Sequence, residues 1–386
     1  MPEQSRGLGA LPGYPLAAVP MLKRRLAAQG VDVIDLGAGD ALLLPPDHVL
    51  DALRRASGDV GMSRYGFQLG HVPYREAIAA WMGRRFGVEL DPFEQILPLL
   101  GSKEGLAHLP LAYLNPGDVG IIPDPGYQAY EGGILLAGGD VVRLPLRAEK
   151  GFLMDVGELD GDVLGRAKLL YANYPNNPTA AAPTTEYLER LVGFCREHDL
   201  LLAYDNAYSE IAFDGYVPPS ILQIPGALDV AVEFHSLSKT YNMTGWRLGW
   251  AAGNGEALRA LSQAKTFIDT GAFKALQAAG AAALEHAESW VPGNVDLFRR
   301  RRDAVAAALA RGGWAVEPPR ATMYFWVPVP TGEASAEFTQ RILEETGVVV
   351  LPGSALGAAG EGFFRIALTQ DEARLDEAME RLTRVG

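Results

Sequence analysis

One lysine lies in a segment rich in small hydroxyl residues, Ser236-Leu-Ser-Lys239-Thr-Tyr-Asn-Met-Thr-Gly-Trp-Arg247. An apolar run at residues 230–234 precedes it and has the composition of a strand, so the lysine is expected near a strand end. A lysine that attacks an aldehyde must be partly desolvated, because only its neutral amine is nucleophilic. Ser236, Ser238 and Arg247 supply the hydroxyl and guanidinium groups that bind phosphate. The segment therefore indicates a Schiff-base lysine beside a phosphate site, with a solvated surface loop as the alternative.

Two polar residues end other apolar runs. Asn177 lies in Tyr171-Ala-Asn-Tyr-Pro-Asn-Asn177-Pro, where the prolines fix the direction of its amide for a hydrogen bond to a ligand. Asn-Pro is also an ordinary turn signal, which is the alternative. Asp205 ends the run Leu200-Leu-Leu-Ala-Tyr-Asp, where a buried carboxylate needs a partner such as a protonated ring nitrogen. Tyr208 can reach the same side of such a site, and a helix N-cap is the alternative for Asp205.

The segment Gly101-Ser102-Lys103-Glu-Gly follows the expected strand at 95–100 and opens a helix. Backbone N–H groups at a helix start bind anions, and the helix dipole strengthens that preference. The segment is neither a Walker A loop nor a Gly-x-Gly-x-x-Gly fingerprint, so it does not indicate nucleotide binding. An ordinary strand-to-helix turn is the alternative. Tyr127 ends the stiff turn Pro-Asp-Pro-Gly-Tyr and suits either stacking on a flat cofactor or ordinary packing.

Arg365 lies inside the apolar run Gly-Phe-Phe-Arg-Ile-Ala-Leu, where a guanidinium needs a carboxylate or a similar partner. Its planar fork suits a substrate carboxylate, and a structural ion pair is the alternative. Together these motifs offer a lysine, a partner for a ring nitrogen, phosphate ligands, a stacking ring and a carboxylate fork. That set is what pyridoxal 5′-phosphate requires of a protein.

The elements that must position these residues alternate between short apolar runs and amphipathic helices. Seven strands are expected, at residues 95–100, 118–122, 140–144, 168–173, 200–204, 230–234 and 247–252. Helices are expected at 49–56, 74–86, 103–114, 127–137 and 184–198, and the Ala/Gly-rich run 275–283 indicates a tight helix contact. Such alternation predicts an α/β fold with a mostly parallel sheet flanked by helices. Ligands of these sheets bind at the carboxyl ends of the strands, where most of the candidate residues fall.

The pattern changes toward the C-terminus. A long helix at 294–310 leads to strands expected at 314–316, 324–329, 348–351 and 363–367, with helices at 335–346 and 370–383. A helix at 20–30 and a strand at 33–36 precede the Pro45-Pro46 break and are expected to join this region. A chain of 386 residues is long enough for two domains. We therefore predict a large α/β domain at 45–284 that binds the cofactor, and a smaller α+β domain formed by 1–44 and 285–386.

The composition, 48% hydrophobic and 21% charged, is typical of a soluble globular chain. A net charge of −13 and the absence of a long basic cluster argue against nucleic-acid binding. No apolar run is long enough to span a membrane, and the order of apolar and basic residues near the N-terminus does not fit a secretory signal. The only cysteine, Cys195, cannot form an internal disulfide, which favours a reducing compartment. We therefore expect a cytoplasmic protein, and its motifs include no set of metal ligands.

With these motifs the chain resembles the class I/II aminotransferases of fold-type I over nearly its whole length. The resemblance implies that pyridoxal 5′-phosphate is the cofactor and that Lys239 forms the Schiff base and moves the substrate proton. It also implies that Asp205 pairs with the pyridine nitrogen of the cofactor. Asn177 and Tyr208 would bond the ring oxygen. The activity implied is transfer of the amino group of an L-amino acid to a 2-oxo acid by a ping-pong mechanism.

The same resemblance assigns the rest of the cofactor contacts. Tyr127 would stack on the ring, while Ser236, Arg247 and the backbone of Ser102 and Lys103 would hold the phosphate.

The resemblance also implies contacts with a second subunit and with the substrate. Tyr65, in Arg-Tyr-Gly-Phe-Gln-Leu-Gly, matches the tyrosine that reaches the phosphate of the neighbouring subunit, so an obligate homodimer with shared active sites is implied. Arg365 would clamp the α-carboxylate of the substrate, with help from Asn177 and the backbone of Gly39.

The segments 14–17 and 33–40 and the run Ala321-Thr-Met-Tyr-Phe-Trp look most like the subgroup of LL-diaminopimelate and related aspartate, alanine or methionine aminotransferases. The donor and the acceptor stay open, because no distal cation for a second carboxylate is evident. Four residues are candidates for it, namely Lys23, Arg64, Lys265 and Lys274.

Two departures from the family pattern bear on the substrate mouth. Ala180 stands where glycine is usual after Asn177-Pro-Thr, and Ala41 stands where proline is common. Two other functions remain open on this scaffold. A β-eliminating (C–S) lyase uses the same cofactor chemistry, since fold alone does not decide between them. A non-catalytic regulator that binds the cofactor is a remote alternative.

Overall fold

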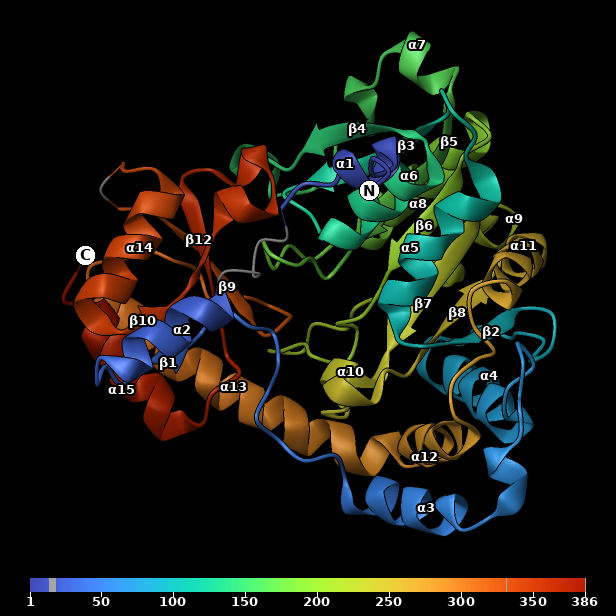
Figure 1. Ribbon diagram of the computed structural model, residues 1–386, viewed down its shortest axis with the longest axis horizontal. Coiled ribbons are helices and arrows are strands. Elements are labelled where there is room, and N and C mark those ends of the chain that lie inside the picture. Colours follow the sequence, from blue (N-terminus) through green and yellow to red (C-terminus); the bar gives the residue numbers. More distant parts are fainter. Residues whose placement is uncertain (14–18, 331, 386) are drawn as a thin grey trace.

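The computed structural model describes residues 1–13, 19–330 and 332–385 (Figure 1). The segment 14–17, one of those used to predict the subgroup, lies outside the described residues. The described chain contains one large sheet and two small ones. The large sheet and its helices occupy the right of Figure 1, and elements from both ends of the chain form a second body on the left.

The large sheet has seven strands in the order β2-β8-β7-β6-β5-β3-β4. Their bounds are β2 Ile96–Leu99, β3 Val119–Asp124, β4 Asp140–Pro145, β5 Ala167–Asn173, β6 Leu201–Asp205, β7 Ala231–Ser236 and β8 Gly249–Gly253. Only β8 runs antiparallel to its neighbours, β2 and β7. The prediction of a mostly parallel seven-stranded sheet is therefore confirmed, and every strand lies close to its expected bounds.

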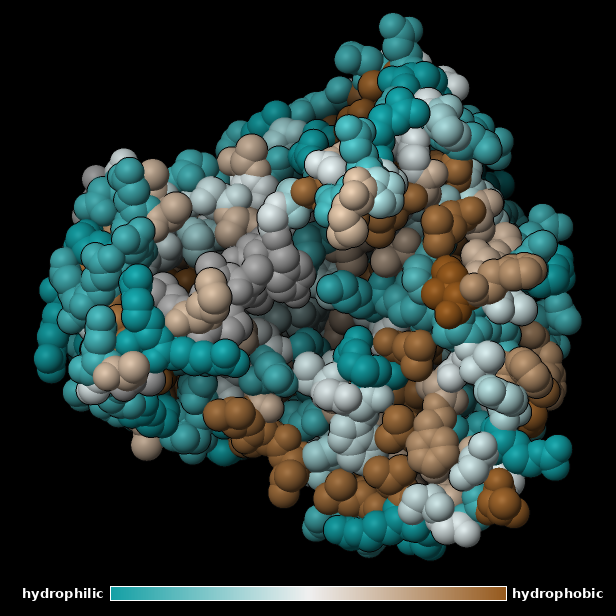
Figure 2. All heavy atoms as spheres, in the orientation of Figure 1, coloured by the Kyte–Doolittle hydropathy of each residue, from teal (hydrophilic) through white to brown (hydrophobic). Residues whose placement is uncertain are grey.

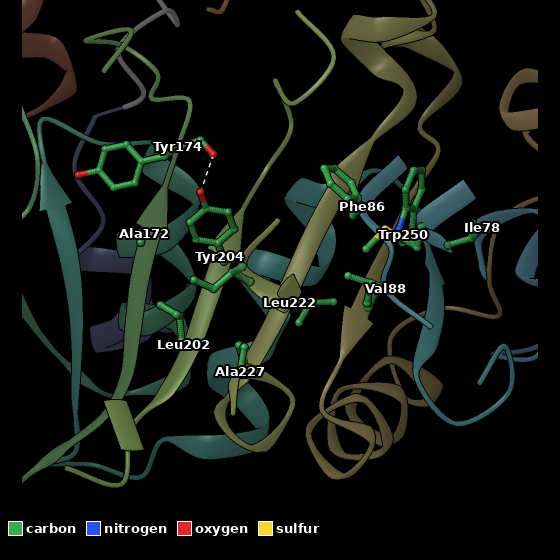
Figure 3. Packing of buried hydrophobic residues seen from close by; sticks show 14 of the residues in the cluster. Ile78, Phe86, Val88, Ala172, Tyr174, Leu202, Tyr204, Leu222, Ala227 and Trp250 are labelled. Carbon is green, nitrogen blue, oxygen red and sulfur yellow. Dashed lines mark hydrogen bonds between the residues drawn. The ribbon is translucent and has the colours of Figure 1, made fainter. Parts of the chain in front are cut away.

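Helices cover both faces of this sheet, which explains why its strands are apolar on both sides. Neighbouring residues of β5 show the alternation, because Tyr171 packs in one buried cluster and Ala172 in the other. The helices around the sheet are α3 Asp47–Ser57, α4 Val72–Phe86, α5 Ser102–Tyr113, α6 Gln128–Ala137, α8 Thr185–Glu197, α11 Gly255–Thr266 and α12 Lys274–Glu285. Figure 3 shows the larger cluster, in which the Tyr204 hydroxyl donates to the Tyr174 carbonyl at 2.9 Å.

The second body is built on β9 Tyr324–Pro328 and β12 Phe363–Ala367, which pair antiparallel with each other, and on β11 Leu351–Pro352. The N-terminal strand β1 Ile34–Asp35 pairs in parallel with β10 Val348–Val349. The accompanying helices are α2 Val19–Ala28, α13 Ala287–Arg311, α14 Ser335–Thr346 and α15 Glu372–Leu382. Short helices elsewhere are α1 Arg6–Gly9, α7 Gly161–Leu164, α9 Ala227–Val230 and α10 Leu237–Thr240.

Two expectations for this region are wrong. Residues 314–316 do not form a strand, because Trp314 is buried by packing its ring edge-on against Phe364 rather than by joining a ladder. The run 348–351 is divided between two sheets, since β10 pairs with β1 and β11 pairs with β12. Apolar composition thus indicates burial correctly but not strand pairing. None of the helices in the described part of the chain is long and apolar enough to cross a membrane.

The Ala/Gly-rich helix α12 packs closely against α3 and α4, as predicted. Gly280 of this helix has no room for a side chain, because an added Cβ would fall 2.6 Å from Leu248 and 2.8 Å from Tyr74 of α4. Both neighbours are fully buried and have no room to move away. This contact fixes the helix behind the segment that carries Lys239, because Leu237 lies 3.1 Å from the same added atom.

We expect Gly280→Ala to destabilise the protein by about 1–3 kcal/mol, the usual cost of overpacking a rigid core. The matched control is Gly193→Ala in α8, an exposed position with no atom within 4 Å of the added Cβ. That change should stabilise the protein by roughly 0.5–1 kcal/mol, since alanine favours a helix over glycine. Urea unfolding of both variants measures the difference, and a neutral or stabilising Gly280→Ala would contradict the tight contact.

Candidate active site

A cavity of about 410 Å³ opens at the carboxyl ends of the parallel strands. Segment 38–40, Tyr324 of β9 and Arg365 of β12 close it from the other body. All predicted site residues except Tyr65 line it, namely Gly39, Ser102, Lys103, Tyr127, Asn177, Asp205, Tyr208, Ser236, Lys239, Arg247 and Arg365. The structure therefore brings together residues from distant parts of the sequence, from Gly39 to Arg365.

Lys239 lies in the short helix α10 that directly follows β7. Ser236 caps this helix, and its hydroxyl accepts a hydrogen bond from the backbone N–H of Ser238 at 3.1 Å. The Lys239 ammonium donates to the backbone carbonyl of Gly39. The lysine thus extends across the cavity from the strand end, and its amine is held by a neutral acceptor rather than by a carboxylate.

Asp205 ends β6 and is almost completely buried. Tyr130 donates its hydroxyl hydrogen to Asp205 Oδ2 at 2.7 Å. The other carboxylate oxygen, Oδ1, is buried and has no hydrogen-bond partner among the described residues. Burial raises the pKa of Asp205 to about 6, although the Tyr130 hydrogen bond and the nearby backbone N–H of Ala207, whose geometry falls short of a full hydrogen bond to Oδ1, act in the opposite direction. A turn rather than a helix follows Asp205, so the N-cap alternative is wrong.

Asn173 links Asp205 to Asn177. Its side-chain amide donates to the backbone carbonyl of Asp205 at 2.8 Å, and its side-chain oxygen accepts from the backbone N–H of Asn177 at 2.8 Å. The turn that follows contains Ala180 at φ +58°, a left-handed conformation that glycine adopts without strain. Ala180 therefore holds a backbone conformation that suits the glycine usual in the family.

A second group of residues surrounds the start of α5. Gly101 precedes the helix at φ +81°, and an added Cβ there would collide with the Arg247 guanidinium. Arg247 Nη1 donates to the Thr244 carbonyl at 2.7 Å and lies 3.5 Å from the Ser238 hydroxyl. Backbone N–H groups of the first helical turn, two serine hydroxyls and a guanidinium thus converge, which is an arrangement that binds phosphate.

Arg365, on β12, lines the same cavity as this phosphate cradle and is 4% exposed. It donates to Asn177 Oδ1 and to the Gly37 carbonyl, both at 2.6 Å, while its Nε has no partner among the described residues. Within the described chain Arg365 makes no ion pair, so the structural ion-pair alternative is not supported. A buried guanidinium without a counter-ion favours an anionic ligand.

Among the residues that the sequence does not assign to the site, Asn173 and Tyr324 line the cavity, and Tyr130 contacts the site through Asp205. The Tyr324 ring lies under the Arg365 guanidinium at 4.2 Å, and its hydroxyl is 3.1 Å from that of Tyr208. Burial would raise the pKa of Tyr324, but the nearby Arg365 and Lys239 cations outweigh it and hold that pKa below its ordinary value. Asn173 ends a strand as Asp205 does, a signal that could have identified it, whereas both tyrosines lie in runs that indicate only core packing.

Tyr65 does not line the cavity and is 74% exposed. The four candidates for a distal cation also lie outside the cavity lining. For Lys265 the prediction is wrong, because this lysine is completely buried and paired with Glu104 and Asp269. Lys23 is paired with Asp35 at 2.9 Å.

We expect Asp205→Asn to stabilise the cofactor-free protein at pH 7–8. The folded state binds the Asp205 proton more tightly than the unfolded state, so the contribution of this group falls as pH rises from 3.8 through about 6. The free energy of unfolding of the variant should exceed that of the wild type by roughly 2–3 kcal/mol above that range, and by progressively less toward pH 5. Urea unfolding as a function of pH measures the difference, with the exposed Asp162→Asn as control. A gain that does not depend on pH would contradict the raised pKa.

The chain matches a known family over most of its length. The profile of the family "Aminotransferase class I and II" matches residues 31–382. The LL-diaminopimelate aminotransferase of Desulforudis audaxviator is 48% identical over 379 residues, covering 98% of this chain and 97% of the relative. Among solved structures, BacF from Bacillus subtilis in its substrate-bound form has a TM-score of 0.95 at 33% identity, covering 100% of this chain and 98% of the other.

A probable N-succinyldiaminopimelate aminotransferase from Thermus thermophilus has a TM-score of 0.90 at 39% identity and covers 96% of this chain and 99% of its own. Both the whole-length match and the architecture of the site agree with the resemblance seen in the sequence. The chain therefore belongs to the class I and II aminotransferase family.

Proposed function

We propose that this protein uses pyridoxal 5′-phosphate to transfer the amino group of an L-amino acid, with LL-diaminopimelate as the preferred donor, to a 2-oxo acid. The observation that carries the proposal is the meeting of three groups in one cavity, namely Lys239, the unpaired Asp205 oxygen and the Arg365 guanidinium that lacks a counter-ion in the described chain. These groups supply an amine, a partner for a protonated ring nitrogen and a partner for a carboxylate.

The residues present fit the cofactor. The unpaired Oδ1 of Asp205 needs a hydrogen-bond donor, and a protonated pyridine nitrogen is one. The start of α5, with Ser236 and Arg247, suits the phosphate, and Gly101 leaves the space that a side chain would fill. Tyr127 lies at the wall of the same cavity, where its ring suits stacking. When bound, pyridoxal phosphate supplies an electron sink for the negative charge that develops at the substrate α-carbon.

Side chains of the cavity have separate roles in the proposed reaction. Arg365 and Asn177 orient the substrate α-carboxylate, because the guanidinium is already fixed by the Gly37 carbonyl and the Asn177 side chain. Lys239 Nζ would accept the proton from the substrate α-carbon and return it to the reacting group. The Gly39 carbonyl accepts a hydrogen bond from this amine and so holds it within the cavity. Asp205 stays ionised opposite a cationic ring nitrogen, since that partner offsets the cost of its burial.

The side chains of Tyr208 and Tyr324 form the wall next to Arg365. The backbone of Gly39 contacts the Tyr324 hydroxyl so closely that no Cβ fits there. We infer that Tyr208 bonds the cofactor ring oxygen together with Asn177, and that the Tyr324 hydroxyl fixes the direction of the Tyr208 hydroxyl.

The donor is inferred from the relatives. The protein from Desulforudis audaxviator carries the name LL-diaminopimelate aminotransferase, and the Thermus thermophilus structure is described as a probable aminotransferase of N-succinyldiaminopimelate. A second LL-diaminopimelate aminotransferase, from Trichormus variabilis, is 47% identical over 383 residues and covers 99% of this chain and 98% of its own. These names support transamination over β-elimination and over a regulator without activity, and no contact among the described residues of the cavity favours either alternative.

We further propose that a second copy of the chain completes the site. Exposed apolar side chains gather on the segments 65–69 and 267–273, namely Tyr65, Phe67, Leu69, Phe267, Ile268 and Phe273. The two segments lie together, because Gln68 Nε2 donates to the Asp269 carbonyl at 3.0 Å. Figure 2 shows hydrophobic side chains on the lower right of the visible face, around the helices α3 and α12 of Figure 1, and α12 directly follows the segment 267–273. A surface of this kind favours association with another copy, which would bring Tyr65 to the partner's phosphate cradle.

The domain limits and the compartment belong to the same proposal. Every strand of the large sheet lies within 45–284, and the pairing of β1 with β10 supports a smaller domain formed by 1–44 and 285–386. Cys195 is the sole cysteine and is buried, which favours a reducing compartment such as the cytoplasm.

Single amino acids added without a 2-oxo acid test the activity. LL-diaminopimelate should shift the visible absorption of the bound cofactor to that of its amino form and release one oxo product per site. The DD stereoisomer is the matched control, and Lys239→Ala should give no turnover with either isomer. Absorption that persists while ammonia and a keto acid accumulate would identify a lyase. Absence of any cofactor band after pyridoxal phosphate is supplied would refute the proposal.

Mixed dimers test the shared site. Tyr65→Phe should weaken cofactor affinity about tenfold, because one charge-assisted hydrogen bond to the phosphate is lost. In a mixed dimer of Tyr65→Phe and Lys239→Ala subunits, the site that keeps Lys239 receives an intact tyrosine from its partner. That site should bind pyridoxal phosphate with wild-type affinity in a spectroscopic titration. Weak binding in the mixed dimer would mean that each subunit uses its own Tyr65, whereas a Tyr65→Phe homodimer with unchanged affinity would mean that Tyr65 does not contact the phosphate.

A further inference from the structure

A cluster of three charged residues, one completely buried and two partly buried, lies beside the loop that opens α5. Lys265, in α11, is completely buried, and its ammonium donates to Glu104 and, at 2.9 Å, to Asp269 Oδ2. None of the three lines the active-site cavity. A buried ionic cluster is weak evidence for stability, since apolar residues often fill such a space equally well. Stability alone therefore does not explain why these three residues are joined by directional hydrogen bonds.

Glu104 connects the cluster to the phosphate cradle. It is the third residue of α5, and its Oε2 accepts a hydrogen bond from the backbone N–H of Leu100 at 2.7 Å. The carboxylate thus reaches back over the first turn and fixes the loop 100–103, as the acidic residue of a capping box does. The backbone N–H groups of this loop are those that face the phosphate in the proposed function.

Asp269 connects the cluster to the loop that carries Tyr65. Its Oδ1 accepts from the backbone N–H of Gly271 at 2.7 Å, and its backbone carbonyl accepts from Gln68 Nε2 at 3.0 Å. Gly271 has φ +85° and packs so closely on Phe67 that an added Cβ would lie 2.5 Å from the Phe67 carbonyl oxygen. The turn shaped by Asp269 therefore supports the loop 66–71.

The cluster does not form a cation site for a metal. Within the described chain, Glu104, His108 and Asp269 are the one group of metal-ligand types whose ligand atoms lie within 4.8 Å of each other. The Lys265 ammonium bonds both carboxylates and takes the place that a metal ion would need. Two carboxylates and one lysine leave one negative charge, and the N-terminal end of α5 is a favourable place for it.

We propose that Lys265, Glu104 and Asp269 are positioning residues that tie the phosphate cradle to the loop 66–71. Through this cluster, phosphate binding in the cradle orders the loop that presents Tyr65 to a second copy of the chain. This inference rests on the proposed function, because it takes the ligand of the cradle to be the phosphate group of pyridoxal phosphate.

The physical basis is that both loops hold the same rigid ionic group from opposite sides. A phosphate bound to the cradle restricts the first turn of α5 and hence the orientation of the Glu104 carboxylate. Lys265 transmits that restriction to Asp269 because it bonds both carboxylates at once. Linkage is reciprocal, so an ordered loop 66–71 strengthens phosphate binding by the same factor.

The test uses the full-length protein with Tyr65→Phe as background, which removes any direct contact of Tyr65 with a partner's phosphate. Asp269→Asn keeps the acceptor for Gly271 but weakens the hold on Lys265, and Lys265→Met removes the ammonium. Two ligands are titrated, pyridoxal 5′-phosphate and pyridoxal, which lacks the phosphate. We expect both variants to lose about tenfold in affinity for pyridoxal phosphate, the effect of one charge-assisted hydrogen bond, and to bind pyridoxal unchanged.

Hydrogen exchange of the loop 66–71 is the second readout. In the Tyr65→Phe background, pyridoxal phosphate should slow exchange in this loop, and in the cluster variants the slowing should be confined to residues 100–113. The control is Glu94→Gln, which breaks the exposed ion pair between Glu94 and Arg259 of α11 and should change neither readout. If Lys265→Met does not fold, it is replaced by the triple variant Lys265→Met/Glu104→Gln/Asp269→Asn, which neutralises both carboxylates that lose their cation.

Two results together would overturn the inference and leave the proposed function intact. The folded cluster variants would have the same ratio of affinities for pyridoxal phosphate and pyridoxal as Tyr65→Phe alone, and pyridoxal phosphate would still slow hydrogen exchange in the loop 66–71. Equal losses for pyridoxal and pyridoxal phosphate would also overturn it, since they indicate a general loss of structure. A wild-type protein that binds neither ligand would overturn the proposed function and this inference together.

Discussion

The carboxylate of Asp205 lies at the buried end of β6 with one oxygen held by Tyr130 and the other without a partner among the described residues. Burial of an incompletely bonded carboxylate is costly, and the surrounding structure is arranged so that a cationic ligand relieves that cost. Asn173 holds the backbone at the same position, and Tyr130 restricts the side chain. The orientation of a ring bound there follows from this single constraint, because its nitrogen must face the unpaired oxygen.

The remaining site residues are arranged around that fixed point by two separate bodies. The large sheet positions the amine and the phosphate ligands on the segments that follow β7 and β2 and on the one that precedes β8, which lies between them. The carboxylate fork comes from the other body, and Arg365 crosses to Asn177 just as Lys239 crosses to Gly39. These two hydrogen bonds run in opposite directions across the cavity, so the relative placement of the two bodies and the geometry of the site depend on each other.

Site residues that follow apolar runs can be predicted from the sequence. A polar group at the end of a buried strand is costly unless it has a partner, and a bound ligand is one such partner. Lys239, Asn177 and Asp205 are predictable in this way. Tyr130 and Tyr324 are not, since a tyrosine in an apolar run indicates ordinary packing whether or not its hydroxyl meets a ligand. The prediction for Lys265 fails for the opposite reason, because its two acidic partners are brought to it only by the fold.

The turn after Asn177 holds an alanine, Ala180, in a left-handed conformation. A residue with a Cβ costs about 1–2 kcal/mol in this region, whereas glycine is nearly indifferent to it. Alanine also has fewer accessible backbone conformations than glycine. The backbone entropy gained when this turn opens is therefore smaller with alanine than it would be with glycine. The ligand-free enzyme therefore has local backbone strain at Ala180 but a turn with few alternative conformations. The amide of Asn177 consequently keeps its direction before any substrate binds.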